Sequence, residues 1–419
     1  MMLRSTVSLL ALVLAAPALG ALPEGPGPAG AKTAAEAEQC PWQAAWASSQ
    51  MLPDAANALP DGALEDATLR QIIRPSIAGT HVRVRLSNAF GTTPLQIGNA
   101  TLARSANNAS ADIDAATMEP LRFGGFAGTV IPPGGEWLSD PIRWQGSAFE
   151  DLAISVHVLQ HPERQTSHPG SRATSYVARG DATKASGLAG AMAVDHWYLL
   201  SGLEVRSCAA SQGIAVLGDS ITDGRGSTTN GNDRWTDFLA RRLKGRAAVL
   251  NQGIGGNRVL LDGLGPNAVA RLDRDVLAQP GVRHLIVLEG INDIGNLARG
   301  RTASAEEHAA LVAQVTAAYG QIIERAHARD IKVHGATLLP FMGNDFYNSG
   351  AASEADRQAI NHWIRTSGAF DSVIDLDAVM RDPARPDYLN PAYDIGDGLH
   401  PNPAGFRAMA EAVSLSLFE

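Results

Sequence analysis

The chain of 419 residues contains only two cysteines, Cys40 and Cys208, and aromatic side chains make up 5% of it. Two isolated cysteines provide no Cys/His cluster at metal-ligand spacing, so the sequence predicts no metal site. No stretch rich in Lys or Arg occurs and the formal net charge is −9, which argues against a nucleic-acid-binding protein. A phosphate-cradling loop of the Walker type is also absent. We therefore expect neither a cofactor nor a nucleic-acid partner.

Long apolar runs are scarce as well, since only Val7 to Ala16 is almost wholly apolar. That run is too short to span a bilayer comfortably, which takes about 20 residues. Arg4 precedes it and the small-x-small triplet Ala18-Leu-Gly20 follows it, a pattern typical of a cleavable signal peptide over residues 1–20. We expect a secreted or periplasmic protein without stable membrane insertion; a retained N-terminal anchor is the lesser alternative.

Export bears on the two cysteines, because an oxidising compartment favours disulfides. Cys40 lies at the start of the mature chain and Cys208 lies near its middle. We expect the two thiols to be bridged. Two buried free thiols are the alternative, because sequence alone does not fix the geometry that a disulfide needs.

The length of the chain suggests about two domains. Residues 21–41 are rich in Ala, Gly, Pro and Glu and predict a flexible leader. Short strand patterns separated by turn signals occupy residues 42–207, and no internal repeat is found. Residues 208–419 instead alternate apolar strands with helical segments, so we expect an all-β domain followed by an α/β domain.

The clearest strand of the first domain is His81-Val-Arg-Val-Arg-Leu86, in which apolar and polar residues alternate strictly. Such strands with Gly-Pro turns and no convincing helix predict a β-sandwich or jelly-roll. The other strand candidates are Leu95 to Leu102, Gly128 to Ile131, Asp151 to Leu159 and Trp197 to Val205.

Continuous apolar strands between helices predict a parallel sheet covered by helices on both faces in the second domain. The clearest helices are expected from about Glu306 to Arg329 and from about Pro403 to Leu417. The strand candidates are Ile214–Leu217, Ala247–Leu250, Leu285–Leu288, Ile331–Thr337 and Val373–Leu376.

A serine lies directly after the first of these strands, in Gly218-Asp-Ser220. The carboxyl end of a buried strand is where open α/β sheets form their binding crevice. A serine hydroxyl becomes a nucleophile only when a base takes its proton. Asp397-Gly-Leu-His400 supplies an imidazole with a carboxylate three residues away, close enough for one turn to hold both. The alternative is that this turn only caps a helix.

Two further segments, Asn251-Gln-Gly-Ile-Gly-Gly-Asn257 and Gly290-Ile-Asn-Asp293, lie between the serine and the histidine. With Gly-Asp-Ser and Asp-x-x-His they form four blocks that resemble those of the SGNH (GDSL) hydrolase superfamily, in the same order, over about residues 211–419. The chain contains no Gly-x-Ser-x-Gly elbow, which argues against the α/β-hydrolase fold. The residues in and around the four blocks resemble those of one branch of the superfamily, the secreted arylesterases and acylhydrolases of polysaccharide-degrading bacteria.

The resemblance implies an SGNH-type three-layer α/β/α domain, with Ser220 as nucleophile, His400 as general base and Asp397 as its partner. It also implies an oxyanion hole made by the Ser220 N–H, the Gly256 N–H and the Asn292 side-chain amide. Gly255 is a rival for Gly256 by one position, and Asn292 as a helix cap is the structural alternative.

Other polar residues of the blocks are interpreted as supports. Asp219 is expected to hold the turn by hydrogen bonds to nearby backbone, and Arg258 is expected to lie on the surface. The groups expected to hold loops around the site are Asp223, Arg225, Asn257 and Asp293.

The resulting expectation is a serine esterase that removes small acyl groups, most plausibly acetyl, from a small ester or an acylated polysaccharide. A broader arylesterase or lipolytic acylhydrolase is the alternative, with Phe341, Met342 and Tyr393 as candidates to line an acyl pocket. A carbohydrate-binding protein with an inactive hydrolase domain is a further alternative. The tryptophans of the β-domain are expected to be mostly buried, with a scaffolding role for that domain; glycan binding through exposed aromatic side chains is the alternative.

Overall fold

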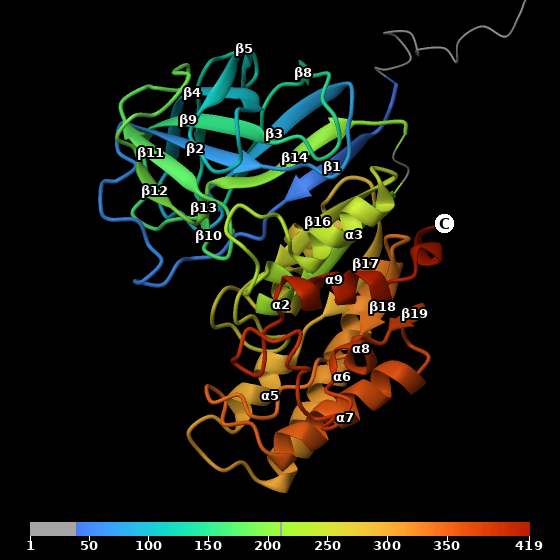
Figure 1. The fold of residues 1–419 in the computed structure, drawn as a ribbon. Coiled ribbons are helices and arrows are strands. Elements are labelled where there is room, and N and C mark those ends of the chain that lie inside the picture. The colour runs from blue at the N-terminus through green and yellow to red at the C-terminus, as the bar shows by residue number, and fades with distance from the viewer. Residues whose placement is uncertain (1–38, 210–211) are drawn as a thin grey trace, which may run out of the picture.

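The computed structural model describes residues 39–209 and 212–419. The signal peptide predicted over residues 1–20 and most of the leader therefore lie outside the described residues. An all-β region is followed by an α/β region, and the two pack side by side (Figure 1). Within the described ranges, no helix has the length and apolar character needed to cross a membrane.

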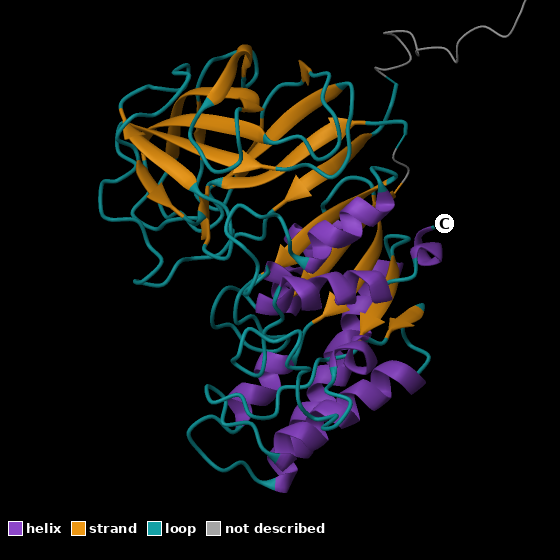
Figure 2. Ribbon diagram, viewed as in Figure 1, coloured by secondary structure: helices purple, strands orange, loops and turns teal. Residues whose placement is uncertain are grey.

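The all-β region is built from antiparallel sheets (Figure 2). Its larger sheet has the order β12-β11-β2-β9-β4-β5 with β6 beside β4, and a second sheet has the order β1-β14-β3-β7 with β8 beside β3. The strands are β1 (Trp42–Ala47), β2 (Ala67–Ile73), β3 (His81–Ser87), β4 (Leu95–Ser105), β5 (Ile113–Pro120), β6 (Thr129–Ile131), β7 (Glu136–Leu138), β8 (Ile142–Arg143), β9 (Leu152–Gln160), β10 (Ser167–His168), β11 (Ser175–Arg179), β12 (Met192–Val194), β13 (Trp197–Tyr198) and β14 (Leu200–Arg206).

Apolar side chains from both sheets enter one core, as in a β-sandwich, and the predicted all-β fold is confirmed. Val82, Val84 and Leu86 are buried on one face of β3, as their alternation predicts. Trp144 and Trp197 are also buried, whereas Trp137 is 41% exposed.

One segment predicted as a single strand of this region forms two strands instead. The segment from Trp197 to Val205 is split into β13 and β14, because Leu199 adopts a left-handed backbone with a φ of 58°. The break lets β13 pair with β10 while β14 pairs with β1 and β3. A pattern of apolar residues does not reveal a change of partner within a run.

The α/β region contains a parallel sheet of order β16-β15-β17-β18-β19, and the predicted α/β fold is confirmed. Its strands are β15 (Gln212–Gly218), β16 (Ala247–Gly253), β17 (Val282–Leu288), β18 (Lys332–Ala336) and β19 (Ser372–Ile374). Its helices are α2 (Ser220–Asp223), α3 (Trp235–Leu243), α4 (Ala268–Leu272), α5 (Ile291–Leu297), α6 (Ala305–His327), α7 (Ala351–Thr366), α8 (Leu376–Met380) and α9 (Pro403–Ala412), with a π-helical turn at Asp273–Leu277 and a 3₁₀ turn at Leu415–Phe418.

The strand order places the site. From β15 the chain passes through α3 to β16 on one side, then through α4 to β17 on the other side of β15. Right-handed crossovers in opposite directions put α3 and α4 on opposite faces of the sheet. Helices therefore cover both faces, and a crevice opens beyond the carboxyl ends of β15 and β17, where the order reverses.

The last helix is shorter than predicted. Its periodicity predicts a helix from Pro403 to about Leu417, but α9 ends at Ala412, where Val413 becomes extended. A β-branched valine followed by Ser414 favours a helix less than the preceding residues do, and the 3₁₀ turn resumes only at Leu415.

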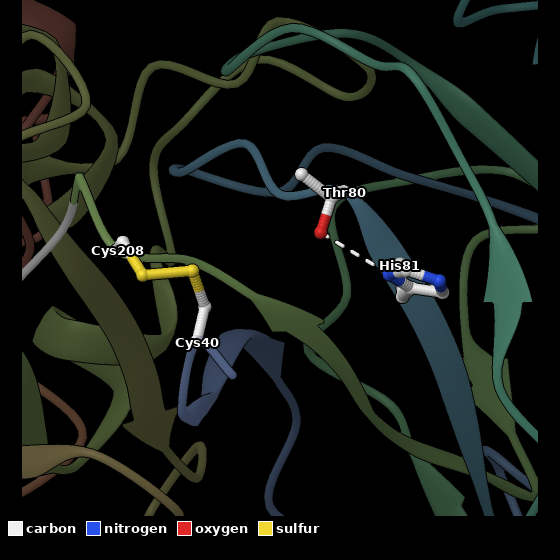
Figure 3. Close-up of a disulfide and its surroundings, with 4 residues drawn as sticks. All are labelled: Cys40, Thr80, His81 and Cys208. Atoms are coloured by element: carbon white, nitrogen blue, oxygen red, sulfur yellow. Dashed lines mark hydrogen bonds between the residues drawn. A yellow bond between two sulfur atoms is a disulfide. The ribbon is translucent and has the colours of Figure 1, made fainter. Parts of the chain in front are cut away.

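The predicted disulfide between Cys40 and Cys208 is present (Figure 3). Cys40 lies two residues before β1 and Cys208 two residues after β14, and these strands are paired from Trp42 and Arg206 onward. The bridge therefore ties the entrance of the β-region to its exit. The β-region also contacts the parallel sheet, since Val249 N of β16 donates to Ser76 Oγ at 2.9 Å and one apolar core runs through both regions.

Candidate active site

Ser220 lies at the carboxyl end of β15, as the sequence predicts. Asp219 caps the short helix α2 by accepting a hydrogen bond from Ile221 N at 2.9 Å, so Ser220 is the first residue of that helix. A first-turn N–H has no carbonyl of a preceding turn to accept its hydrogen. The turn therefore presents both the Oγ and the backbone N–H of Ser220, whose side chain lines a cavity of about 860 Å³.

Three side chains form a hydrogen-bonded series at this point. Ser220 Oγ lies 2.8 Å from His400 Nε2, and His400 Nδ1 lies 2.7 Å from Asp397 Oδ2. The other oxygen of Asp397 accepts hydrogen bonds from the backbone N–H groups of Leu399 and His400. The alternative of a mere capping turn does not apply, because α9 is capped by Asn402.

The electrostatics of Asp397 suit a permanently charged partner. Burial alone would raise the pKa of this carboxyl. The hydrogen bonds from the His400 side chain and from the His400 and Leu399 backbone outweigh burial and lower the pKa of Asp397 to about 2. The carboxylate therefore stays ionised and can stabilise a protonated imidazole.

Asn292 and Gly256 line the same cavity as Ser220. Asn292 lies in the first turn of α5, whose cap is Gly290, so Asn292 is not the helix cap. Its Nδ2 donates one hydrogen to Asn257 O at 2.7 Å, and its Oδ1 accepts a hydrogen bond from Tyr347 OH at 2.5 Å. These two bonds fix the plane of the amide and leave its second N–H for another acceptor.

Gly256 is a glycine for a structural reason. Its φ of +72° is a left-handed conformation, and a Cβ there would lie 2.7 Å from Leu264 Cδ1. The neighbouring Gly255 N–H already donates to Asp223 Oδ2 at 2.9 Å. Gly255 is thus engaged elsewhere, which favours Gly256 over its rival for contact with a bound ligand.

A family model described as the GDSL-like lipase/acylhydrolase family matches residues 216–408. The α/β domain of this chain belongs to that family. The match includes the Gly-Asp-Ser turn, both middle blocks and the Asp-x-x-His turn, and it makes the protein a carboxylic ester hydrolase.

Solved structures similar to the GDSL domain include three that cover about half of this chain. One is a GDSL-like lipase from Bacteroides thetaiotaomicron (18% identity, 50% of this chain and 88% of that chain, TM-score 0.38). A second is the acetyl xylan esterase AlAXEase (20% identity, 48% of this chain and 96% of that chain, TM-score 0.36). A third is Est24, a carbohydrate acetylesterase from Sinorhizobium meliloti (15% identity, 49% of this chain and 98% of that chain, TM-score 0.39). No curated protein matches the chain significantly.

Buried polar side chains of the GDSL blocks fix nearby loops by hydrogen bonds to their backbone. Asp293 accepts hydrogen bonds from Val259 N and Leu260 N, and Asn257 Nδ2 donates to two carbonyls of the loop before α4. The sequence predicts these loop-holding roles.

Burial raises the pKa of Asp293 to about 6, against the opposing effect of its two backbone hydrogen bonds. Burial likewise raises the pKa of Asp219 to about 7, with the Ile221 N–H opposing the rise and the charge of Asp293 adding to it.

Arg271 is a structural group that sequence reasoning misses. Its side chain is fully buried and forms an ion pair with Asp275 at 3.1 Å. The guanidinium also donates to Gly218 O at the end of β15 and to Gln252 O in β16. A fourth hydrogen bond reaches Ser49 Oγ in the β-domain. Arg271 thus fixes the carboxyl ends of β15 and β16, next to which the site residues lie. No local sequence motif predicts this role of Arg271.

The β-domain contributes a second group that sequence reasoning misses, His168. His168 Nε2 lies 2.9 Å from Asp223 Oδ1, while His168 Nδ1 lies 2.8 Å from Ser49 O. Asp223 in turn holds Gly255 N, next to Gly256. Burial alone would raise the pKa of Asp223, but the charge and hydrogen bond of His168 lower it. The side chain of Asp223 also closes the space that a Cβ on Gly170 would need.

The two domains together enclose a cavity of about 860 Å³ around Ser220. Its β-domain wall includes His168, Arg172 and His196. Of the aromatic and thioether side chains that the sequence suggests for a pocket, Met342 lines this cavity. Phe341 is instead fully buried in the core, because its loop turns it inward, and Tyr393 packs against that core. Phe346, Tyr347 and Tyr388 line the cavity in their place.

Proposed function

We propose that this protein is an exported serine esterase in which Ser220 is the nucleophile, His400 the general base and Asp397 its orienting partner. The observation that carries this proposal is the series from Ser220 Oγ through His400 to Asp397, with contacts of 2.8 and 2.7 Å, at the wall of a large cavity. Such a chain of contacts activates a hydroxyl for acyl transfer.

In the proposed reaction Ser220 Oγ bonds to the ester carbonyl carbon while its proton passes to His400 Nε2. The tetrahedral intermediate then collapses, the bond to the alcohol oxygen breaks, and His400 gives its proton to that oxygen. Water then gives a proton to His400 Nε2 as its oxygen bonds to the acyl carbon of the acyl-enzyme. The bond between that carbon and Ser220 Oγ breaks, His400 returns the proton to Oγ, and the acid is released. No metal or cofactor takes part in these steps.

The carbonyl oxygen becomes negatively charged in the intermediate and needs donors. The Ser220 N–H, the Gly256 N–H and the second Nδ2 hydrogen of Asn292 are the proposed set. The amide of Asn292 is held by Tyr347 and by Asn257 O, so its orientation is fixed before substrate arrives. Preorganised donors of this kind contribute most when charge develops.

The proposed substrate is a small acyl ester, with acetyl as the acyl group, on a saccharide. The cavity is large enough for a saccharide unit, and polar side chains from both domains line it, including His196, Asn344 and Asp394. The disulfide between Cys40 and Cys208 fits an extracytoplasmic enzyme that meets polysaccharide.

A broader lipolytic or aryl esterase is a second candidate, because apolar side chains are exposed near the cavity. Leu264 and Phe346 line it and are 44% and 57% exposed. Leu261, in the same loop as Leu264, is 62% exposed, and Ile395, in the loop before α9, is 43% exposed. An apolar rim of this kind suits a longer acyl chain.

Hydrolysis of acetylated xylan beside p-nitrophenyl esters of increasing acyl length distinguishes the two candidates. The proposal predicts that kcat/KM is highest for acetyl and falls with chain length, with release of acetate from the polysaccharide. A rise in kcat/KM toward long chains, without acetate release from xylan, would favour the lipolytic candidate. Absence of hydrolysis of any ester would refute both.

A further inference from the structure

Two arginines of the cavity have no partner among the described residues. Arg172, in the segment between β10 and β11, is half-buried, and its Nε is buried without a hydrogen-bond partner. Arg225, just after α2, is exposed and has no side-chain hydrogen bond or ion pair within the described ranges. One guanidinium comes from each domain, and both line the cavity that contains Ser220.

The charges around Arg172 are already engaged with other groups. Asp223 accepts hydrogen bonds through both oxygens, from His168 and from Gly255 N. Arg234, a further cation, pairs with Asp237 and donates to Ser171 O. Asp195 accepts a hydrogen bond from Thr174 Oγ1 at 2.8 Å. The hydrogen-bonding capacity of these carboxylates is therefore used by other donors, although the charges of Asp223 and Asp195 still act on Arg172 beside those of Arg225 and Arg234.

This arrangement disfavours the charged form of Arg172. Burial is the main cause that lowers the pKa of Arg172, and the positive charges of Arg225 and Arg234 lower it further. Asp223 and Asp195 act in the opposite direction without restoring it. A half-buried cation near two others is more stable when an anion binds.

We propose that Arg172 and Arg225 form an anion subsite that binds a carboxylate of the substrate, so that the ester hydrolysed is an acylated acidic saccharide such as a uronic acid. The proposal rests on the proposed function of Ser220 and names the substrate class of that site. The planar guanidinium of arginine matches a carboxylate with two parallel donors, and this geometry accounts for arginine rather than lysine at both positions.

The remaining polar groups of the cavity fit this assignment. Asp345 and Asp394 also line the cavity. Asp394 already accepts hydrogen bonds from the backbone N–H groups of Gly396, Asp397 and Gly398. Arg385 also lines the cavity, but it is paired with Asp382 and stacks on Tyr388. Arg385 therefore has a carboxylate already and serves as a matched control.

The test compares two substrates that differ only in the carboxylate: a methyl glucuronoside with one O-acetyl group and the methyl glucoside acetylated at the same position. The wild-type enzyme should prefer the glucuronoside in kcat/KM by about tenfold or more, the effect expected of a charge-assisted hydrogen bond. Added salt should reduce the preference. Arg172→Gln should remove most of it, Arg172→Lys should restore part, and Arg385→Gln should leave the ratio unchanged.

Equal kcat/KM for the two substrates in the wild-type enzyme would overturn the subsite, as would an Arg172→Gln variant that keeps the preference. Binding of tri-galacturonate to the Ser220→Ala protein, measured by calorimetry against a neutral trisaccharide, tests the subsite without catalysis. Selective binding that Arg172→Gln abolishes supports the subsite even if no ester is hydrolysed. Hydrolysis of neutral esters with no binding of tri-galacturonate overturns the subsite alone and leaves the esterase proposal intact.

Discussion

The amide of Asn292 is held by two neighbours before any substrate is bound. Tyr347 OH donates to its Oδ1, and its Nδ2 donates to Asn257 O. In Asn292→Ala the proposed oxyanion loses one donor that acts mainly in the transition state. We expect kcat to fall about 10²–10³-fold with little change in KM. A large increase in KM with kcat preserved would instead assign Asn292 to ground-state binding.

Tyr347→Phe provides a graded companion to that variant. It removes the hydroxyl that orients the amide but keeps the amide itself. A smaller loss of kcat than in Asn292→Ala is expected, and it should disappear when the substitution is made in the Asn292→Ala background. Additive losses would mean that Tyr347 acts elsewhere.

Asp397→Asn tests the partner of the proposed base. The neutral amide cannot stabilise a charged imidazole or favour the required tautomer, so kcat should fall by about 10³–10⁴-fold. Because the pKa of Asp397 is about 2, its carboxylate is ionised throughout any practical assay range, and the loss should persist across that range. Asp345→Asn, which removes an exposed carboxylate of the same cavity, is the matched control. Equal effects of the two substitutions would contradict the assignment.

Among the elements, those whose signals are local were predicted best. The turn after β15 and the Asp-x-x-His turn are local signals, so the sequence predicts Ser220 at a strand end and Asp397 beside His400. That the two turns meet, 180 residues apart, followed from the resemblance to the four SGNH blocks. The long helix α6 has a periodic pattern and a capping box at Ser304 and Glu307, and its bounds differ little from the prediction.

Two contacts between distant segments that support the site were not predictable. His168 and Asp223 are 55 residues apart and belong to different domains, and Asn292 and Tyr347 are also 55 residues apart. No pattern of hydrophobicity or spacing encodes which loop of a β-domain will reach a strand end of its neighbour. The split between β13 and β14 has the same cause, because a change of pairing partner leaves the apolar run unbroken.

His168, in β10, contributes to the site from the β-domain, and its role can be tested by substitution. His168 contacts Asp223, which holds Gly255, so we expect this histidine, which also lines the cavity, to act by positioning the loop of Gly256. In His168→Gln we expect kcat to fall by about 10- to 100-fold, with a smaller change in KM. The matched control is His327→Gln, which breaks an exposed His–Asp pair with Asp371. Loss of thermal stability with kcat unchanged would show that His168 is only a structural residue.

The β-domain and the GDSL domain form one structural unit around the cavity. The β-domain supplies one wall of the cavity and shares an apolar core with the GDSL domain. The disulfide closes 168 residues of sequence, which include the whole β-domain. Without it, the unfolded chain gains conformational freedom, so the Cys40→Ala, Cys208→Ala double variant should lose about 2–4 kcal/mol of unfolding free energy.

Chemical denaturation with and without reductant measures that loss, and alkylation followed by intact-mass analysis counts free thiols. The wild-type protein purified from an oxidising compartment should resist alkylation until it is reduced. Two thiols that react in the folded, unreduced protein would refute the bridge.

The proposed mechanism requires Ser220 to form the covalent acyl-enzyme. A fluorophosphonate ester reacts with an activated serine and leaves a stable adduct that mass spectrometry can locate. We expect one adduct per chain, on the peptide that contains Ser220, with loss of activity in parallel. In Ser220→Ala the adduct should be absent and turnover of an acetyl ester should fall about 10³-fold or more in a folded protein. An adduct on another residue, or near-normal turnover by Ser220→Ala, would contradict the mechanism.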